Sequence, residues 1–320
     1  MAQQRLLVVG GNGFLGSAVC RAAISRGWDV HSLSTSARAP KMPDGETPAW
    51  TNKVTYHKGS AFEPSTFSHL LPSTTAVVHT MGILLEGDYK SLVNETSLGG
   101  MAARLIGSDR FFNGNPLKPG SNNKTGGGYE AMNRDSAISV LDALLASRAA
   151  ESISPSSSSP SSVSRMTPTV FTYISAEDIF RPFVPDKYIN TKREAELLIN
   201  HYLSAQTNEV DADKVKGLIV RPGVMTHPSL RPLLMPLAPL LALSASIPPV
   251  LPNILRAMSR RSNSIRSEDG SSLDSMARLL ESRTIDVDDV GEAVCVGIEN
   301  QLEGTLGLEN LRAMAQVSTF

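Results

Sequence analysis

A tyrosine and a lysine four residues apart, Tyr188 and Lys192 in "YINTK", are the residues whose types and spacing best suit chemistry. This spacing places both side chains on one face of a helix. A tyrosine near its ordinary pKa of about 10 is a poor acid at neutral pH, whereas a neighbouring ammonium stabilises the phenolate and lowers that pKa. The pair therefore predicts a proton donor to a carbonyl group.

Ser175 stands where a hydroxyl could hold the oxygen of such a substrate. It lies at the end of the apolar run "VFTYISA", which predicts a buried strand, and ligands of parallel sheets bind at the carboxyl ends of strands. A tyrosine–lysine spacing of four also recurs by chance on exposed helices, so the pattern gains its meaning from following this strand. We interpret Ser175, Tyr188 and Lys192 as the candidate catalytic set.

A glycine turn near the start of the chain predicts a nucleotide site. Gly10, Gly13 and Gly16 follow the apolar run "LLVVG" and lead into the helical pattern "FLGSAVCRAAISRG". The first glycine allows the tight bend, the second lets the backbone approach a pyrophosphate, and the third allows close packing of helix on strand. The amino end of the helix then faces the phosphates, which predicts dinucleotide binding.

The end of the next predicted strand, "DVHSLS", bears on which dinucleotide binds. NAD sites place Asp or Glu there for the ribose hydroxyls, whereas this chain has Ser34, followed by Arg38. Without the acid a 2′-phosphate meets no repulsion, and Arg38 could pair with it. The alternative is a solvent-exposed arginine in a loop. The sequence favours NADP(H) over NAD(H).

These residues need a scaffold, and the chain supplies strands that alternate with helices. Apolar runs predict six strands, and helical spacing follows the first strand and recurs at Asn133–Ala149 and Asn190–Leu203. Such alternation implies parallel pairing through right-handed crossovers. We expect an α/β fold, with a doubly wound parallel sheet over residues 1–226 and a small, mainly helical C-terminal cap over residues 227–320.

Three segments interrupt this alternation. Residues 86–128 are rich in Gly and Asn, and residues 151–166 form a Ser- and Pro-rich insertion that we expect to be disordered. Residues Pro232–Leu255 carry no charge, but their prolines argue against a membrane span. We interpret this run as a lipophilic cap, either over a substrate cleft alone or also in peripheral contact with a membrane. The arginines that would suit anionic headgroups are Arg256, Arg260, Arg261 and Arg266.

Composition narrows the range of partners and cofactors. The formal net charge is −1, without the basic excess that is typical of nucleic-acid-binding proteins. The two cysteines and six histidines lack metal-ligand spacing, so neither a disulfide framework nor a metal site is expected. The start "MAQQR" leaves almost no room for a cleavable targeting segment, which makes the cytosol the default location on such signals alone, while internal import signals stay open.

Taken together, the motifs resemble the short-chain dehydrogenase/reductase superfamily in its extended, epimerase/dehydratase-like branch. They are "GGNGFLG", "VVHTMG", "YISA", "YINTK", "IVRPG" and "IDVDDVGEAV". Finer details, such as "HTMGILLEGDYK" and "YEAMNRDSAI", are similar to a fungal mitochondrial group assigned to coenzyme Q (ubiquinone) biosynthesis, which is akin to the accessory subunit of respiratory complex I. The resemblance implies a Rossmann-type NAD(P)-binding fold and a mitochondrial location on the matrix side of the inner membrane.

The resemblance also assigns residues to a cofactor site and gives Lys192 a second role on the nicotinamide ribose. The implied cofactor set is Gly10, Gly13, Phe14, Leu15, Gly16, Ser34, Arg38, His79, Gly82, Lys192, Arg221, Pro222 and Gly223. For His79, a structural histidine at a strand end is an equal alternative. Asp286, Asp288 and Asp289 are expected to cap a C-terminal helix rather than to take part in chemistry.

Two functions stay open at this point. In the first, the protein is an NADP(H)-dependent oxidoreductase that acts on a lipophilic quinone precursor, with other coenzyme Q biosynthesis proteins as partners. In the second, it is a non-catalytic nucleotide-binding assembly factor or structural subunit of a mitochondrial inner-membrane complex. The intact Tyr188–Lys192 pair favours the first function. The missing acid after the second strand, the irregular loops and the atypical character of the family favour the second.

Overall fold

The structure, a computed structural model, describes most of the chain. The described residues are 4–42, 44–72, 74–82, 128–153, 168–179, 181, 186–206, 214–230, 239, 241–243, 250–262 and 272–317. The Gly- and Asn-rich stretch falls outside them apart from residue 128, and the Ser- and Pro-rich insertion apart from residues 151–153. The predictions made for those two segments therefore lie outside the described residues.

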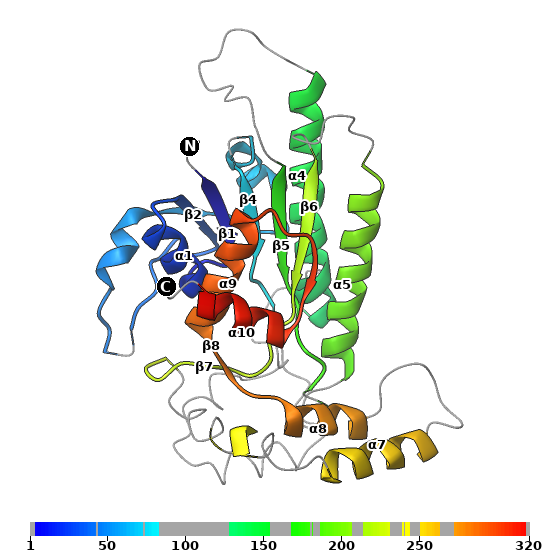
Figure 1. Ribbon diagram of the computed structural model, residues 1–320. Helices are drawn as coiled ribbons and strands as arrows, with labels where there is room; N and C mark the ends of the chain where they lie inside the picture. Colours follow the sequence, from blue (N-terminus) through cyan, green and yellow to red (C-terminus); the bar gives the residue numbers. More distant parts are fainter. Residues whose placement is uncertain are drawn as a thin grey trace, which may run out of the picture.

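Within the described residues, seven strands form one parallel sheet in the order β3-β2-β1-β4-β5-β6-β9 (Figure 1). The strands are β1 (Arg5–Val9), β2 (Asp29–Ser34), β3 (Val54–Lys58), β4 (Ala76–His79), β5 (Thr169–Ile174), β6 (Val215–Val220) and β9 (Gly304–Leu306). The central strands are continuous apolar runs because helices cover both of their faces. The expected doubly wound parallel sheet is confirmed.

Two layers of helices enclose the sheet. Side chains of α1 (Phe14–Ser25), α9 (Val287–Glu299) and α10 (Leu308–Val317) pack with one core cluster, and those of α4 (Ser136–Ile153) and α5 (Asp186–Ser204) with the other. A π-helical turn, η4 (Glu130–Asp135), leads into α4. Short 3-10 turns flank β3: η1 (Ala49–Lys53), η2 (Pro64–Thr66) and η3 (Ser68–Leu70). The central strands β1 and β4 are therefore shielded from water on both faces.

The C-terminal region is mainly helical, as expected, and divides between the main sheet and its carboxyl edge. β9 pairs with β6, while α7 (Val250–Ser262) and α8 (Ser272–Glu281) lie below the strands (Figure 1). A small sheet of β7 (Met225–Thr226) and β8 (Ile285–Asp286) links the two parts. The domain division at residue 226 stays a prediction.

Some elements differ from the sequence expectation. α5 begins at Asp186, earlier than the expected Asn190, so that Tyr188 lies inside its first turn. Asp186 is favourable in this first turn because its carboxylate lies at the positive end of the helix dipole. The strand β9 was not predicted, because its three residues are exposed or half-buried and show no apolar run.

Candidate functional site

The glycine turn joins β1 to α1 in a geometry that requires glycine. Gly10 has a φ of 85°, and a Cβ on Gly16 would lie 2.2 Å from the Gly10 carbonyl oxygen. Gly13 is the N-cap of α1 without a side-chain hydrogen bond, and no acidic residue occupies the first turn, which begins with Phe14 and Leu15. The N–H groups and positive dipole at this helix end therefore fit a pyrophosphate.

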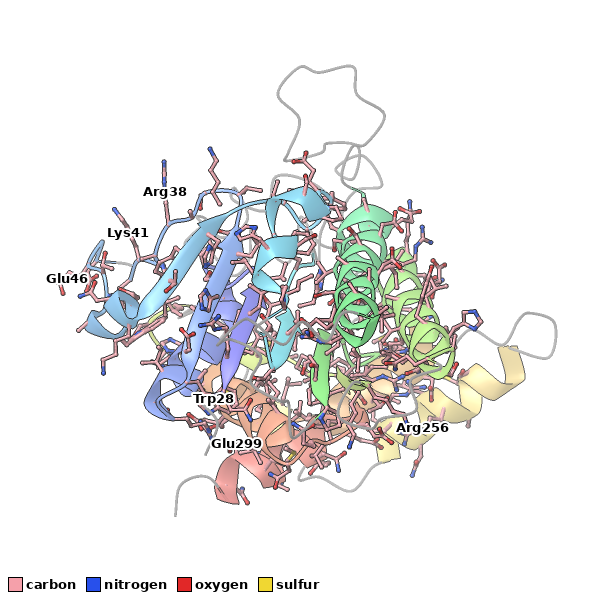
Figure 2. The ribbon with its side chains drawn as sticks, turned by 90° about the horizontal axis from the view of Figure 1, so that it is seen from above. Trp28, Arg38, Lys41, Glu46, Arg256 and Glu299 are labelled. Atoms are coloured by element: carbon pink, nitrogen blue, oxygen red, sulfur yellow. The ribbon has the colours of Figure 1, made fainter. Side chains whose placement is uncertain are left out.

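The loop after β2 lies beside this turn, as a dinucleotide site requires. The amide Nδ2 of Asn12 donates to Ser36 Oγ at 3.2 Å, and the Ala37 N–H donates to Ser34 Oγ at 3.1 Å. Arg38 is exposed and points away from the ribbon (Figure 2), and it forms no ion pair with any described residue. Its position fits both a 2′-phosphate partner and an exposed loop arginine, so the NADP(H) preference stays a prediction.

Lys192 is buried at the carboxyl end of the sheet. Its Nζ donates to the main-chain carbonyl that ends β5 at 2.8 Å and lies 4.9 Å from the centroid of the Tyr173 ring. Gly82 leaves the space for it, since a Cβ there would lie 2.9 Å from both Lys192 Nζ and Asn133 Oδ1. Burial lowers the pKa of Lys192 to about 7, and the Glu196 carboxylate partly opposes that change.

Tyr188 is also buried, and its ring packs edge-on against Tyr129 at a centroid distance of 6.1 Å. Burial raises the pKa of Tyr188 above its ordinary range, Tyr129 adds to this, and the Arg193 guanidinium opposes it in part. The expected lowering of this pKa by Lys192 is wrong for the described arrangement: desolvation of the phenolate outweighs the opposing charge of Arg193, and Lys192 is not among the groups that shift the pKa.

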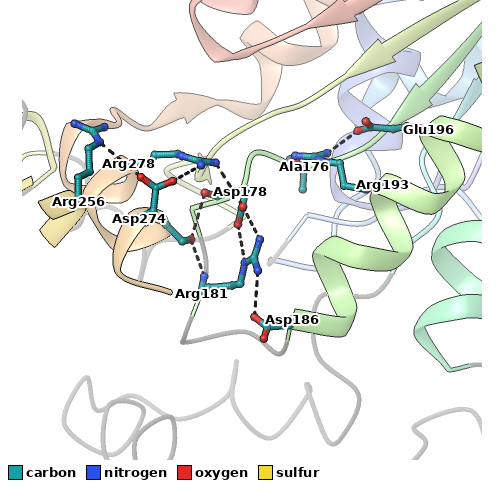
Figure 3. Close-up of polar contacts among 10 residues, drawn as sticks. Ala176, Asp178, Arg181, Asp186, Arg193, Glu196, Arg256, Asp274 and Arg278 are labelled. Carbon is teal, nitrogen blue, oxygen red and sulfur yellow. Dashed lines mark hydrogen bonds and ion pairs between the residues drawn. The ribbon is translucent and has the colours of Figure 1, made fainter. Parts of the chain in front are cut away.

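Ser175 belongs to a buried ionic cluster. Its hydroxyl donates to the Glu196 carboxylate and accepts from Arg193 Nη1 at 3.1 Å. Glu196 also pairs with Arg193 at 2.6 Å and accepts from Arg221 Nε at 3.0 Å. Figure 3 shows Arg193 reaching from α5 towards Ala176, next to Glu196. The cluster ties α5 to the carboxyl ends of β5 and β6.

The remaining residues of the implied cofactor set lie at the same edge of the sheet. His79 Nε2 is 3.0 Å from Ser136 Oγ, whereas its buried Nδ1 has no hydrogen-bond partner among the described residues. Burial lowers the pKa of His79 to about 3, so the ring is neutral. The Pro222 carbonyl accepts from the Glu177 N–H at 3.0 Å, and Gly223 packs close to the cap and α10. The structure thus brings these residues together, and their cofactor contacts stay predictions.

Two side chains that sequence reasoning did not single out complete the arrangement. Asn133 is fully buried in η4, and its Nδ2 donates to Thr191 Oγ1 at 3.3 Å. Glu196 follows Tyr188 and Lys192 at the same spacing of four residues along α5. Because residues four apart share one helix face, this repeated spacing could have placed Glu196 beside Tyr188 and Lys192 from the sequence alone. No comparable local signal marked Asn133.

Other candidate sites contribute less. Asp286 caps α9, since its Oδ1 accepts the Asp288 N–H at 2.9 Å, which confirms the expected capping. Across the described ranges, no group of three His, Cys, Asp or Glu side chains could hold a metal ion. In the same part of the chain, no helix is long and apolar enough to cross a membrane.

Comparison with known proteins identifies the family. Residues 6–94 match the NAD dependent epimerase/dehydratase family. MIOREX complex component 2 of Saccharomyces cerevisiae is 36% identical over 223 residues, which cover 69% of this chain and 72% of that protein. The chain belongs to the epimerase/dehydratase family of short-chain dehydrogenase/reductase-like proteins. The family membership expected from the sequence is confirmed.

Further similarities agree with this family at the level of the fold. An uncharacterised chloroplast protein of Arabidopsis thaliana is 44% identical over 79 residues, 25% of each chain. A short-chain dehydrogenase/reductase-family oxidoreductase from Burkholderia thailandensis has a TM-score of 0.52 at 14% identity, covering 100% of this chain and 98% of that one. A short-chain type dehydrogenase/reductase from Mycobacterium ulcerans has a TM-score of 0.50 at 12% identity, with 98% and 91% covered. At these identities the two structures show the shared fold.

Proposed function

We propose that this epimerase/dehydratase-family protein binds a nicotinamide dinucleotide at the glycine turn and acts as an NADP(H)-dependent oxidoreductase on a lipophilic quinone precursor. One observation carries the proposal: Gly82 opens the carboxyl edge of the sheet for the buried ammonium of Lys192, one helical turn from Tyr188. The dinucleotide would supply the hydride. Tyr188 would give or take the proton, while Lys192 would hold the nicotinamide ribose.

The proposal includes a cellular setting. The yeast relative is named as a component of a complex, which supports protein partners for this chain as well. From the resemblance in the sequence, we place the protein on the matrix side of the mitochondrial inner membrane, among coenzyme Q biosynthesis proteins. A peripheral membrane contact belongs to the same proposal, because a lipophilic substrate resides in the bilayer.

The cofactor preference can be tested by thermal unfolding with NADPH or NADH. We expect NADPH to raise the unfolding temperature more, because the Arg38 guanidinium pairs with the 2′-phosphate. Arg38→Met should reduce affinity for NADPH about tenfold and leave NADH unchanged. Lys41→Met is the matched control, since Lys41 is also exposed in this loop (Figure 2). Equal stabilisation by both dinucleotides would refute the preference.

A second function, as a non-catalytic nucleotide-binding subunit of a complex, has its own support. The hydroxyl proton of Ser175 is committed to Glu196, so the serine cannot donate to a substrate carbonyl without leaving that bond. The raised pKa of Tyr188 likewise disfavours proton release. Both features are compatible with a family member that keeps the nucleotide fold without turnover.

Complementation separates the two functions. In cells that lack the native chain, Tyr188→Phe and Lys192→Met should each fail to restore coenzyme Q if catalysis is required. Tyr202→Phe is the control, because Tyr202 lies on the same helix and is exposed. Full restoration by both variants, with unchanged quinone intermediates, would leave only the non-catalytic function.

A further inference from the structure

The outer side of α7 carries an apolar stripe that the described protein does not cover. Leu251, Ile254 and Met258 are 55%, 50% and 53% exposed. Their spacing of three and four residues places them on one face of the helix. The opposite side is turned inward, where Pro252 and Ser259 are buried. Figure 1 shows α7 at the margin of the molecule, beyond α8 and below the strands.

Ion pairs fix which side of α7 faces outward. Arg256 Nη1 donates to Glu281 Oε1 of α8 at 2.7 Å, and its Nε lies 3.7 Å from Asp274 Oδ1. α8 is in turn held to the loop after β5, since Ser275 Oγ accepts the Arg181 N–H at 3.1 Å. Because Arg256 holds the other side of α7 against α8, the apolar stripe faces away from the described protein.

The charge of α7 indicates what the stripe meets. The helix sequence "VLPNILRAMSRRS" contains three arginines and no acidic residue, and Arg260 and Arg261 fall near its end. A helix with one apolar side and a basic composition is typical of segments that lie in the plane of an anionic membrane surface. Basic residues near the surface gain about 1 kcal/mol each from anionic lipids.

We propose that α7 docks on an anionic bilayer, with Leu251, Ile254 and Met258 inserted at the boundary between headgroups and acyl chains. Arg256 stays paired with α8, while the positive charge of Arg260 and Arg261 at the end of the helix attracts the anionic headgroups. This inference deepens the membrane contact of the proposed function and does not depend on catalysis. It also directs the carboxyl edge of the sheet, with Ser175 and Lys192, towards the side where a lipophilic substrate resides.

Vesicle flotation of the full chain tests the docking. We expect binding to phosphatidylcholine vesicles only when they also contain phosphatidylglycerol, and weaker binding at high salt. The triple variant Leu251→Ser, Ile254→Ser and Met258→Ser should lower vesicle affinity at least about tenfold, because three apolar anchors are lost. Leu197→Ser is the matched control, since Leu197 is 71% exposed on α5. An equal loss in the control, or no binding by the native chain, would overturn the proposal.

A fluorescent reporter keeps the inference testable if the triple variant does not fold. Met258→Trp should show a blue-shifted emission when phosphatidylglycerol vesicles are added, whereas Leu197→Trp should not. An unchanged emission at residue 258 overturns the docking, and so does self-association of the chain through the stripe. Thermal stabilisation by NADPH should be the same in all these variants. A variant that loses vesicle binding but keeps its stabilisation by NADPH therefore distinguishes failure of the docking from failure of the nucleotide site.

Discussion

Lys192 is the residue at which burial and charge conflict most directly. Its side chain is 3% exposed, yet its only close acceptor among the described hydrogen bonds is a main-chain carbonyl. Glu196, one helical turn further along α5, helps to keep the ammonium charged, but its carboxylate is shared with Arg193 and Arg221. Strongly shifted groups of this kind cluster at functional sites. A lysine with a pKa of about 7 can bind a ligand whose oxygen atoms accept further hydrogen bonds from its Nζ.

The shifted lysine predicts a pH dependence of stability. The folded pKa is about 7 and the ordinary value is 10.5, so between these values the unfolded chain binds a proton that the folded chain does not. The free energy of unfolding of the native chain should therefore rise with pH, by about 1 kcal/mol per pH unit more than that of Lys192→Met. Urea unfolding of both proteins between pH 7.5 and 9 measures this difference. Parallel slopes would contradict the shift, since other titrating groups are common to both proteins.

At the scale of elements, α8 contacts the described part of the loop that follows Ser175. The loop between Ser175 and Tyr188 places Asp178 against Arg181 at 2.7 Å and against Arg278 of α8 at 3.4 Å. The hydroxyl of Ser275, a residue that is 1% exposed, donates to the Asp178 carbonyl and accepts the Arg181 N–H. These contacts hold α8 against the loop that follows Ser175.

Removing the Ser275 hydroxyl tests whether this contact between α8 and the loop stabilises the fold. Ser275→Ala leaves a buried N–H and a buried carbonyl without that partner, which should lower the free energy of unfolding by about 1–3 kcal/mol. Ser204→Ala, at an exposed serine on α5, should change it by less than about 0.5 kcal/mol. Denaturant unfolding gives both values, and proteolysis of native protein should cut the cap faster in Ser275→Ala. Equal stability of the two variants would show that the hydrogen bonds of Ser275 do not stabilise the fold.

The elements also show what sequence alone can give. Strands buried on both faces appear in the sequence as continuous apolar runs, and the glycine turn is a local motif. The central strands and the turn were therefore predicted correctly. The strand β9 and the amide of Asn133 depend on partners far along the chain and left no local pattern. The pKa of Tyr188 was misjudged for the same reason. Helical spacing indicates only the neighbouring lysine, whereas desolvation by burial and the electrostatic effect of Tyr129 depend on the tertiary structure.

At the scale of the whole molecule, the two ends of the chain share one core. Gly291 of α9 approaches α1 so closely that a Cβ would lie 2.8 Å from the carbonyl carbon of Ala18. Leu6 of β1 and Leu311 of α10 belong to the same cluster, and both are fully buried. The elements that flank the glycine turn, β1 and α1, therefore pack against α9 and α10.

Truncating Leu311 should weaken the whole fold rather than the C-terminus alone. Leu311→Ala opens a cavity in the shared core and should lower the free energy of unfolding by about 2–4 kcal/mol in a single transition. Leu251→Ala, at an exposed leucine, should cost less than about 0.5 kcal/mol in solution. Thermal unfolding followed by circular dichroism compares the two. A separate early transition in Leu311→Ala would mean that α10 unfolds independently.

The packing of α9 on α1 has a consequence for how the protein is made. The first helix leaves the ribosome long before the helix that covers it has been translated. Until then the apolar side of α1, with Ala18 and Val19, lacks its native partner and needs protection from other apolar surfaces. The nucleotide fold is therefore completed only after α9 has been translated. A chain terminated before Val287 should aggregate instead of forming a smaller nucleotide-binding domain.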